Sequence, residues 1–128
     1  GEVSAGLAQT PNYRYADRID GQLFVAGQVP RDINGQMVGI GDAKGQARQC
    51  LNNLSVLLKH HGFREADIRR IVVYVAGNRD EMNATWESVV DWFDNSVPPA
   101  TLLGVALLGY DGQIVEIDAT IVACSNGK

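Results

Sequence analysis

The chain has 128 residues, of which 45% are apolar and 20% charged, and its formal net charge is -4 at pH 7. This composition is typical of a folded domain and excludes a disordered chain. The acidic balance, without a basic run interleaved with aromatics, argues against a nucleic-acid partner. The longest apolar run, residues 101–108, is too short to cross a bilayer, so no membrane span is expected.

The predicted fold opens with two strands, 12–19 and 22–28, because Asp20-Gly21 between them is the commonest two-residue hairpin signal. A helix follows, since apolar side chains recur every three or four residues from Ala47 to His61. Gly62 suits the C-terminal cap of this helix.

The second half of the chain predicts a strand, a helix and two further strands. Residues 68–76 form the strand and include IVVYVA (71–76), a continuous apolar run typical of a strand buried on both faces. Asn78 and Glu81 form a capping box for the second helix, and Pro98-Pro99 ends it. The apolar stripe of this helix is Met82, Trp86, Val89, Val90 and Phe93.

The last two predicted strands, 101–109 and 112–123, are joined by Asp111-Gly112 and are expected to pair with each other. Two helices alternating with strands predict a mixed sheet with both helices on one face. The sequence therefore predicts one α+β domain over residues 1–128, without a linker, a repeat or a low-complexity tract.

Glu116 and Asp118 alternate with apolar residues along the last strand, so they should lie on the sheet face away from the helices. That face also receives Leu and Val side chains, and a face of this kind usually finds a partner in a closed oligomer. A carboxylate at such an interface is partly desolvated, which raises its pKa and suits proton transfer. The alternative is that Glu116 pairs with an Arg or Lys across strands.

No local motif indicates a metal, a phosphate loop or a nucleophile. His60 and His61 are adjacent on a helix and point in different directions, so we expect one to pack inward and the other to lie by the helix end. The segment 39–45, GIGDAKG, lacks phosphate-loop spacing and is interpreted as a loose helix entry. Cys50 and Cys124 are expected to be reduced thiols of a cytoplasmic protein, and no signal peptide is expected.

Four strings, in this order, match the pattern of a known family nearly end to end. They are PNY…LFVAGQVP (11–30), QARQCLNNLSVLLKHHG (46–62), MNATWE (82–87) and VEIDATIVA (115–123). The chain resembles the RidA/YjgF family of reactive-intermediate deaminases. The resemblance implies a chorismate-mutase-like fold and a barrel-like homotrimer with a small-molecule metabolite in each cleft between subunits.

The resemblance also implies a chemistry that needs no metal or organic cofactor. In the family, an arginine grips the carboxylate of an imino or enamino acid, and a glutamate orients or activates the water that hydrolyses the C=N bond. On this pattern Glu116 is the expected catalytic residue. The expected substrate-binding residues are Tyr13, Ala26 (where a serine is common), Gly27 and Asn83.

The family arginine has no counterpart in the chain. Without a gap Ala100 takes its place, and a one-residue slip offers Thr101, whose hydroxyl cannot supply a bidentate cationic fork. We include both positions in the expected substrate-binding set. Arg14, Arg18, Arg31 and Arg79 are possible compensating cations, and Arg31, just after GQVP, is expected near the pocket rim.

Three functions are therefore compared. The first is hydrolysis of an enamine or imine whose carboxylate is absent or presented differently. The second is a non-catalytic trimer that binds a small ligand or regulates a partner, which the missing arginine favours. The third, a ribonuclease or translation inhibitor, fits least, because the chain is acidic and has no pair of histidines for general acid/base chemistry.

Overall fold

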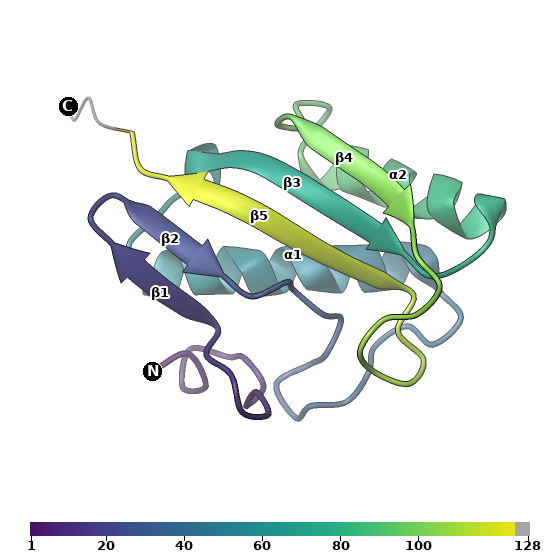
Figure 1. The fold of residues 1–128 in the computed structure, drawn as a ribbon, viewed down its shortest axis with the longest axis horizontal. Coiled ribbons are helices and arrows are strands. Elements are labelled where there is room, and N and C mark those ends of the chain that lie inside the picture. The colour runs from purple at the N-terminus through teal and green to yellow at the C-terminus, as the bar shows by residue number, and fades with distance from the viewer. Residues whose placement is uncertain (125–128) are drawn as a thin grey trace.

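The fold is a five-stranded mixed sheet with two helices packed on one face (Figure 1). The computed structural model describes residues 1–124. The sheet order is β1-β2-β5-β3-β4, with helices α1 and α2 behind it in Figure 1, which confirms the predicted α+β class. The elements are β1 (Ala16–Ile19), β2 (Gln22–Val25), α1 (Ala43–His60), the 3-10 turn η1 (Glu65–Asp67), β3 (Ile68–Val75), α2 (Arg79–Trp92), β4 (Ala100–Gly104) and β5 (Val115–Val122).

The N-terminal hairpin turns at Asp20-Gly21 as predicted, and Ile19 pairs with Gln22 beside the turn. Its strands are shorter than the predicted 12–19 and 22–28. Asn12 adopts a φ of 61°, which a strand does not allow, and Gln28 joins the sheet only through a single bridge to Ile117.

Helix α1 begins four residues before the predicted segment, at Ala43. Asp42 caps it by accepting a hydrogen bond from the Gly45 backbone N–H at 3.0 Å, so the segment 39–45 is the helix entry it was interpreted to be. Gly62 follows the helix end with a φ of 81°, a conformation that favours glycine.

Helix α2 carries the predicted capping box. The Glu81 backbone N–H donates to Asn78 Oδ1 at 2.8 Å, and the Asn78 backbone N–H donates to Glu81 Oε1 at 3.0 Å. Val89 is fully buried, and Met82, Trp86 and Phe93 pack against the core as partly buried side chains.

The predicted pairing of the last two strands is wrong, because β3 lies between β4 and β5. Strand β4 runs parallel to β3, from the Ile71–Ala100 pair to the Val75–Gly104 pair, as a crossover through α2 requires. The apolar run that predicted a strand to residue 109 leaves the sheet at Gly104. Its second half is loop, in which Leu107 is 85% exposed.

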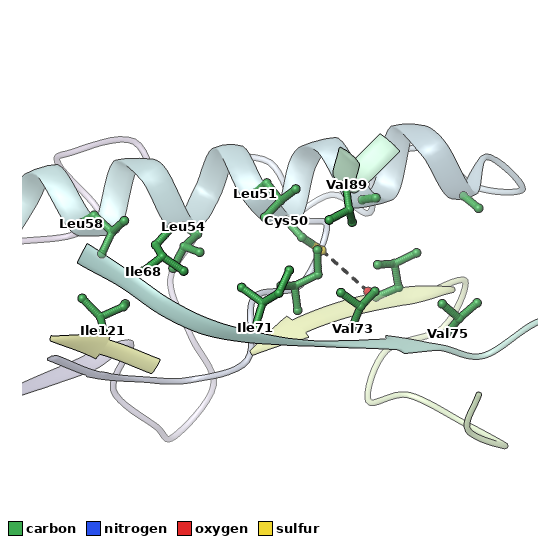
Figure 2. Close-up of a cluster of buried hydrophobic side chains, with 14 of the residues drawn as sticks. Cys50, Leu51, Leu54, Leu58, Ile68, Ile71, Val73, Val75, Val89 and Ile121 are labelled. Atoms are coloured by element: carbon green, nitrogen blue, oxygen red, sulfur yellow. Dashed lines mark hydrogen bonds between the residues drawn. The ribbon is translucent and has the colours of Figure 1, made fainter. Parts of the chain in front are cut away.

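The core lies between α1 and the sheet (Figure 2). Cys50 faces β5 and donates a weak hydrogen bond from its Sγ to the Val115 carbonyl at 3.7 Å, drawn as the dashed line in Figure 2. Val115, Ile117 and Ile121 of β5 are fully buried on this side. No helix among residues 1–124 is long and apolar enough to cross a membrane.

Candidate functional site

The sheet face away from the helices, here called the outer face, carries Glu116 and Asp118, as the alternation along β5 predicts. Tyr74 lies opposite Glu116 and Val72 lies opposite Asp118. Exposed apolar side chains share this face, namely Ile19 (54% exposed), Phe24 (52%) and Val122 (36%). The outer face therefore combines two carboxylates with apolar surface in contact with solvent.

The Glu116 carboxylate lies directly against the backbone of Gly27. A Cβ atom built on Gly27 would lie 2.2 Å from Glu116 Oε2 and 2.9 Å from Glu116 Cδ. Any other residue at position 27 would have to displace this carboxylate. The structure thus brings together two of the predicted site residues, from segments 89 positions apart in the chain.

A buried glutamine, Gln113, holds the other carboxylate oxygen. Its Nε2 donates to Glu116 Oε1 at 3.2 Å and to the Val115 carbonyl at 3.0 Å, and its Oε1 accepts from the Tyr110 backbone N–H at 3.2 Å. Gln113 is 6% exposed, so these bonds are sheltered from water. Gln113 directly follows the predicted turn at Asp111-Gly112, and no local pattern marks it as a site residue.

Gln46 of α1 fixes the backbone that leads into β5. Its Oε1 accepts from the backbone N–H groups of Ile114 and Val115 at 2.7 and 3.2 Å. Its Nε2 donates to the carbonyls of Gly39 and Gly112 at 3.2 and 2.8 Å. Gln46 is fully buried and all its hydrogen-bonding capacity is used.

Beyond Gln113 lies a cluster of one arginine and tyrosines. Arg31 Nη1 donates to Tyr110 Oη at 3.2 Å, and its guanidinium lies 4.9 Å from the centre of the Tyr110 ring. Tyr110 Oη lies 3.3 Å from Tyr13 Oη. Burial raises the pKa of the Tyr13 phenol well above its usual range, the hydrogen bond with Tyr110 adds to this, and burial also raises the pKa of Tyr15.

Ala26 lines a shallow hollow of about 250 Å³ beside Gly27. Tyr15 and Phe24 also line it, and the Ala26 backbone N–H donates to the Tyr15 carbonyl at 2.8 Å. The predicted residues Tyr13, Ala26, Gly27 and Glu116, with Arg31, are thus connected through short contacts.

Three other predicted residues are not joined to this group within one chain. Ala100 pairs with Ile71 and so lies on the helix side of the sheet, and Asn83 is exposed on α2 in the helix layer. Thr101 lies on the outer face but on β4, where its Oγ1 accepts a hydrogen bond from Arg70 Nη2 at 2.8 Å. Arg70, a cation on the outer face, was not among the four arginines considered from the sequence.

One group of side chains among residues 1–124 has metal-ligand geometry, and it lies at the C-terminal end of α1. The donor atoms of Glu2, His60 and His61 lie within 4.8 Å of one another. A 2.9 Å hydrogen bond between His61 Nε2 and Glu2 Oε2 accounts for the contact and lowers the pKa of Glu2. The expected inward packing of one histidine is wrong, since His60 is exposed and His61 is half-buried against Glu2.

Comparisons with known proteins show what nearly the whole chain is similar to. The model of the Endoribonuclease L-PSP family matches residues 4–123. A RutC family protein of Pyrococcus horikoshii, PH0854, is 32% identical over 109 residues, covering 84% of this chain and 83% of the relative. The 2-iminobutanoate/2-iminopropanoate deaminase of Salmonella typhimurium is 31% identical over 102 residues, covering 78% of each chain.

Solved structures share the fold. A putative endoribonuclease of Thermotoga maritima superposes with a TM-score of 0.83 at 24% identity, covering 94% of each chain. The Escherichia coli protein TdcF, solved with bound serine, superposes with a TM-score of 0.77 at 22% identity, again covering 94% of each chain. The chain belongs to the Endoribonuclease L-PSP family, which includes the RutC, YjgF and Rid proteins.

Proposed function

We propose that the protein is a hydrolase that deaminates an enamine or imine, with Glu116 as its catalytic residue. The observation that carries this proposal is the position of the Glu116 carboxylate, which lies close to the Gly27 backbone and accepts a hydrogen bond from Gln113. A relative 31% identical to this chain is named as a deaminase of 2-iminobutanoate and 2-iminopropanoate, which supports the same reaction class here.

The reaction assigned to Glu116 is general-base hydrolysis of a C=N bond. The carboxylate takes a proton from a water molecule as the water oxygen bonds to the imine carbon, and the nitrogen receives a proton. The resulting carbinolamine breaks its C–N bond as Glu116 passes the hydroxyl proton to the nitrogen, so that a ketone and ammonia leave. An enamine enters the same route after its β-carbon gains a proton. An imine is already electrophilic, so the protein mainly positions the substrate and moves protons.

The substrate cannot be held here in the way the family holds its usual 2-imino acid. Ala100 and Thr101 stand where the family arginine is expected, and neither carries a charge. Truncating one partner of an arginine–carboxylate pair costs about 2–5 kcal/mol, which corresponds to roughly tens- to thousands-fold in affinity. We propose a substrate whose carboxylate is absent or is bound elsewhere, with Tyr13, Ala26, Gly27, Asn83 and Thr101 in contact with it.

The proposed site lies between the subunits of a homotrimer. The exposed Ile19, Phe24 and Val122 on the outer face support an interface there, because water-exposed apolar surface of this kind is usually buried in an assembly. We propose that the same assembly brings Asn83 and Ala100 of one subunit near Glu116 of another. The serine bound by TdcF supports a small-molecule ligand. Free Cys50 and Cys124 fit a cytoplasmic protein.

A non-catalytic ligand-binding trimer is the second candidate, and the uncharged pair Ala100 and Thr101 favours it. Cleavage of RNA fits less well despite the family description. The sequence has two histidines, both at the end of α1 beside Glu2, so neither can act as an acid or base next to Glu116.

A deamination assay on the native protein and on Ala100→Arg tests the proposal. Imines are generated in place by an amino-acid oxidase and span acidic, apolar and aromatic side chains, and ammonia release is measured. Activity of the native protein supports a hydrolase in which another group replaces the arginine. Activity only after Ala100→Arg supports an intact catalytic site whose natural substrate lacks the carboxylate that the family arginine binds. Silence of both variants rejects the hydrolase in favour of the ligand-binding trimer.

A further inference from the structure

Arg31 is a half-buried cation without an acidic partner. No carboxylate among residues 1–124 lies within ion-pair distance of its guanidinium. Its polar contacts are neutral: Nε donates to the Gly35 carbonyl at 3.2 Å, and Nη1 donates to Tyr110 Oη at 3.2 Å. A partly desolvated charge with no counter-ion gains free energy when an anion binds next to it.

The hydrogen bonds of this cluster leave one phenol proton free. Arg31 has donors only, so Tyr110 Oη accepts from it. Tyr110 Oη and Tyr13 Oη lie 3.3 Å apart, and either of them can be the donor in this contact. Whichever phenol donates there, the O–H of the other is not used within the cluster and can donate to a ligand.

The Tyr13 phenol is both protonated and accessible. Tyr13 is 41% exposed, so a ligand can reach its O–H. Burial and the contact with Tyr110 raise the pKa of Tyr13 above its usual range, which keeps the phenol a donor at neutral pH. The Thr10 hydroxyl donates to the Tyr13 carbonyl and anchors the segment that carries the ring.

The cluster is attached to the proposed catalytic residue. The Tyr110 backbone N–H donates to Gln113 Oε1, and Gln113 Nε2 donates to Glu116 Oε1, each at 3.2 Å. One buried amide therefore connects the residue that stacks on Arg31 with the carboxylate that is proposed to activate water. Arg31 and Tyr13, at one end of these linked contacts, can hold an anionic group of a substrate. Glu116, at the other end, can then act at the imine carbon of the same substrate.

We propose that Arg31, Tyr110 and Tyr13 form an anion-binding site, and that it takes the carboxylate of a small imino or enamino acid. The site replaces the arginine that is missing at Ala100 and lies on a different segment of the chain. This inference rests on the proposed function for the identity of the anion. It assigns the substrate class to carboxylate-bearing imines, approached from the 31–35 loop and not from the start of β4.

Isothermal titration with a pair of isosteric ligands tests the site independently of catalysis. The probes are 2-oxobutanoate and its uncharged analogue 2-oxobutanamide. The variants are Arg31→Gln, Arg31→Lys and Tyr13→Phe, with Arg48→Gln, an exposed arginine of α1, as the matched control. We expect the native protein to bind the acid at least about 10-fold tighter than the amide, and Arg31→Gln to abolish this preference.

The three remaining variants test whether the preference for the acid depends on this site. Tyr13→Phe is expected to weaken acid binding about 10- to 100-fold, because a net hydrogen bond to a charged group is lost, and Arg48→Gln should change nothing. Arg31→Lys keeps the charge without the planar fork, so it should retain part of the preference if Arg31→Gln fails to fold. Equal binding of acid and amide, no binding of the acid, or a preference that survives both Arg31→Gln and Tyr13→Phe would overturn the site.

The two proposals can fail separately. If the native protein prefers the acid but hydrolyses no imine, the anion site stands and the hydrolase is rejected. If imines are hydrolysed without any preference for acid over amide, the hydrolase stands and the anion site is rejected. Glu116→Gln should bind the acid at least as tightly as the native protein, since it removes a nearby negative charge.

Discussion

At the residue scale, the position of the Glu116 carboxylate depends on a neighbour without a side chain. Gly27→Ala would place a Cβ 2.2 Å from Glu116 Oε2, so the carboxylate must move. We expect kcat/KM to fall about 10- to 100-fold, because displacing a reacting group by an ångström is costly. The melting temperature should change little, since the displaced atom is the far end of a flexible side chain.

Gly21→Ala is the matched control for this substitution, because a Cβ there would meet only Ala123 Cβ, at an ordinary 3.8 Å. Full activity of Gly27→Ala, or equal losses in both variants, would show that the close approach of Gly27 and Glu116 has no catalytic role.

The two thiols should differ sharply in reactivity. Burial raises the pKa of Cys50 well above its usual range, and the charge of Glu116 adds to the shift, whereas Cys124 is exposed. The Cys50 thiol therefore stays protonated and inaccessible at pH 8. Alkylation by iodoacetamide followed by peptide mass spectrometry should label Cys124 alone in the native protein and both cysteines in denaturant. Equal labelling rates under native conditions would contradict the packing in Figure 2.

Sequence reasoning located part of the residue-level site and missed the rest for a physical reason. Glu116 was found because alternation along a strand places it on one face, and the family pattern pointed to Gly27. Gln113 and Tyr110 act through side-chain hydrogen bonds within a loop of ten residues, 105–114, and no local pattern reports such contacts. Arg70 was missed because its partner Thr101 lies on a strand whose pairing was predicted wrongly.

At the element scale, Gln46 ties α1 to segment 112–115 at the start of β5 through three hydrogen bonds, and to Gly39 through a fourth. Gln46→Leu leaves buried backbone groups without partners, and each such group costs about 1–3 kcal/mol. We expect the free energy of unfolding in urea to fall by about 3 kcal/mol. Gln36→Leu, at an exposed loop position, should stay within about 0.5 kcal/mol of the native value. A similar small change for Gln46→Leu would contradict this role.

Signals within one element predicted the helices well and the strand ends poorly. The capping box of Asn78 and Glu81 is a local interaction, so it fixed the start of α2 correctly. The end of β2 at Val25 depends on its partner strands: Val25 pairs with Ala16 of β1, and pairing with β5 stops at Phe24, which the local sequence does not specify. Residues 101–109 are uniformly apolar, so nothing in the pattern marked where β4 ends.

At the scale of the whole molecule, strand order was the part that the sequence could not determine. A hairpin joining the last two strands and a parallel β3–β4 pair are both compatible with the order of elements. The crossover through α2 is formed in the structure, and it leaves β4 as an edge strand with β3 on one side.

The proposed homotrimer can be tested through the exposed apolar side chains of the outer face. Sedimentation equilibrium should give three times the chain mass of 13.8 kDa for the native protein. Phe24→Asp places a charge among exposed apolar side chains and should shift the mass toward one chain, because a buried unpaired charge is costly. Val3→Asp, at a 51% exposed apolar residue near the N-terminus, is the control and should leave the mass unchanged. A native monomer would contradict the proposed location of the site between subunits.

The most direct test of the account compares the two carboxylates of β5 in a single assay. Glu116→Gln and Asp118→Asn make the same change two residues apart on the same face. Within residues 1–124, the Asp118 side chain accepts a single hydrogen bond, from the backbone N–H of its neighbour Ala119 to Oδ1 at 2.9 Å. On the imine that the native protein hydrolyses fastest, Glu116→Gln should lower kcat/KM by about 10²- to 10⁴-fold, whereas Asp118→Asn should keep it within about 3-fold. Equal rates for the native protein and Glu116→Gln, or equal losses in both variants, would contradict the assignment of Glu116 as the general base.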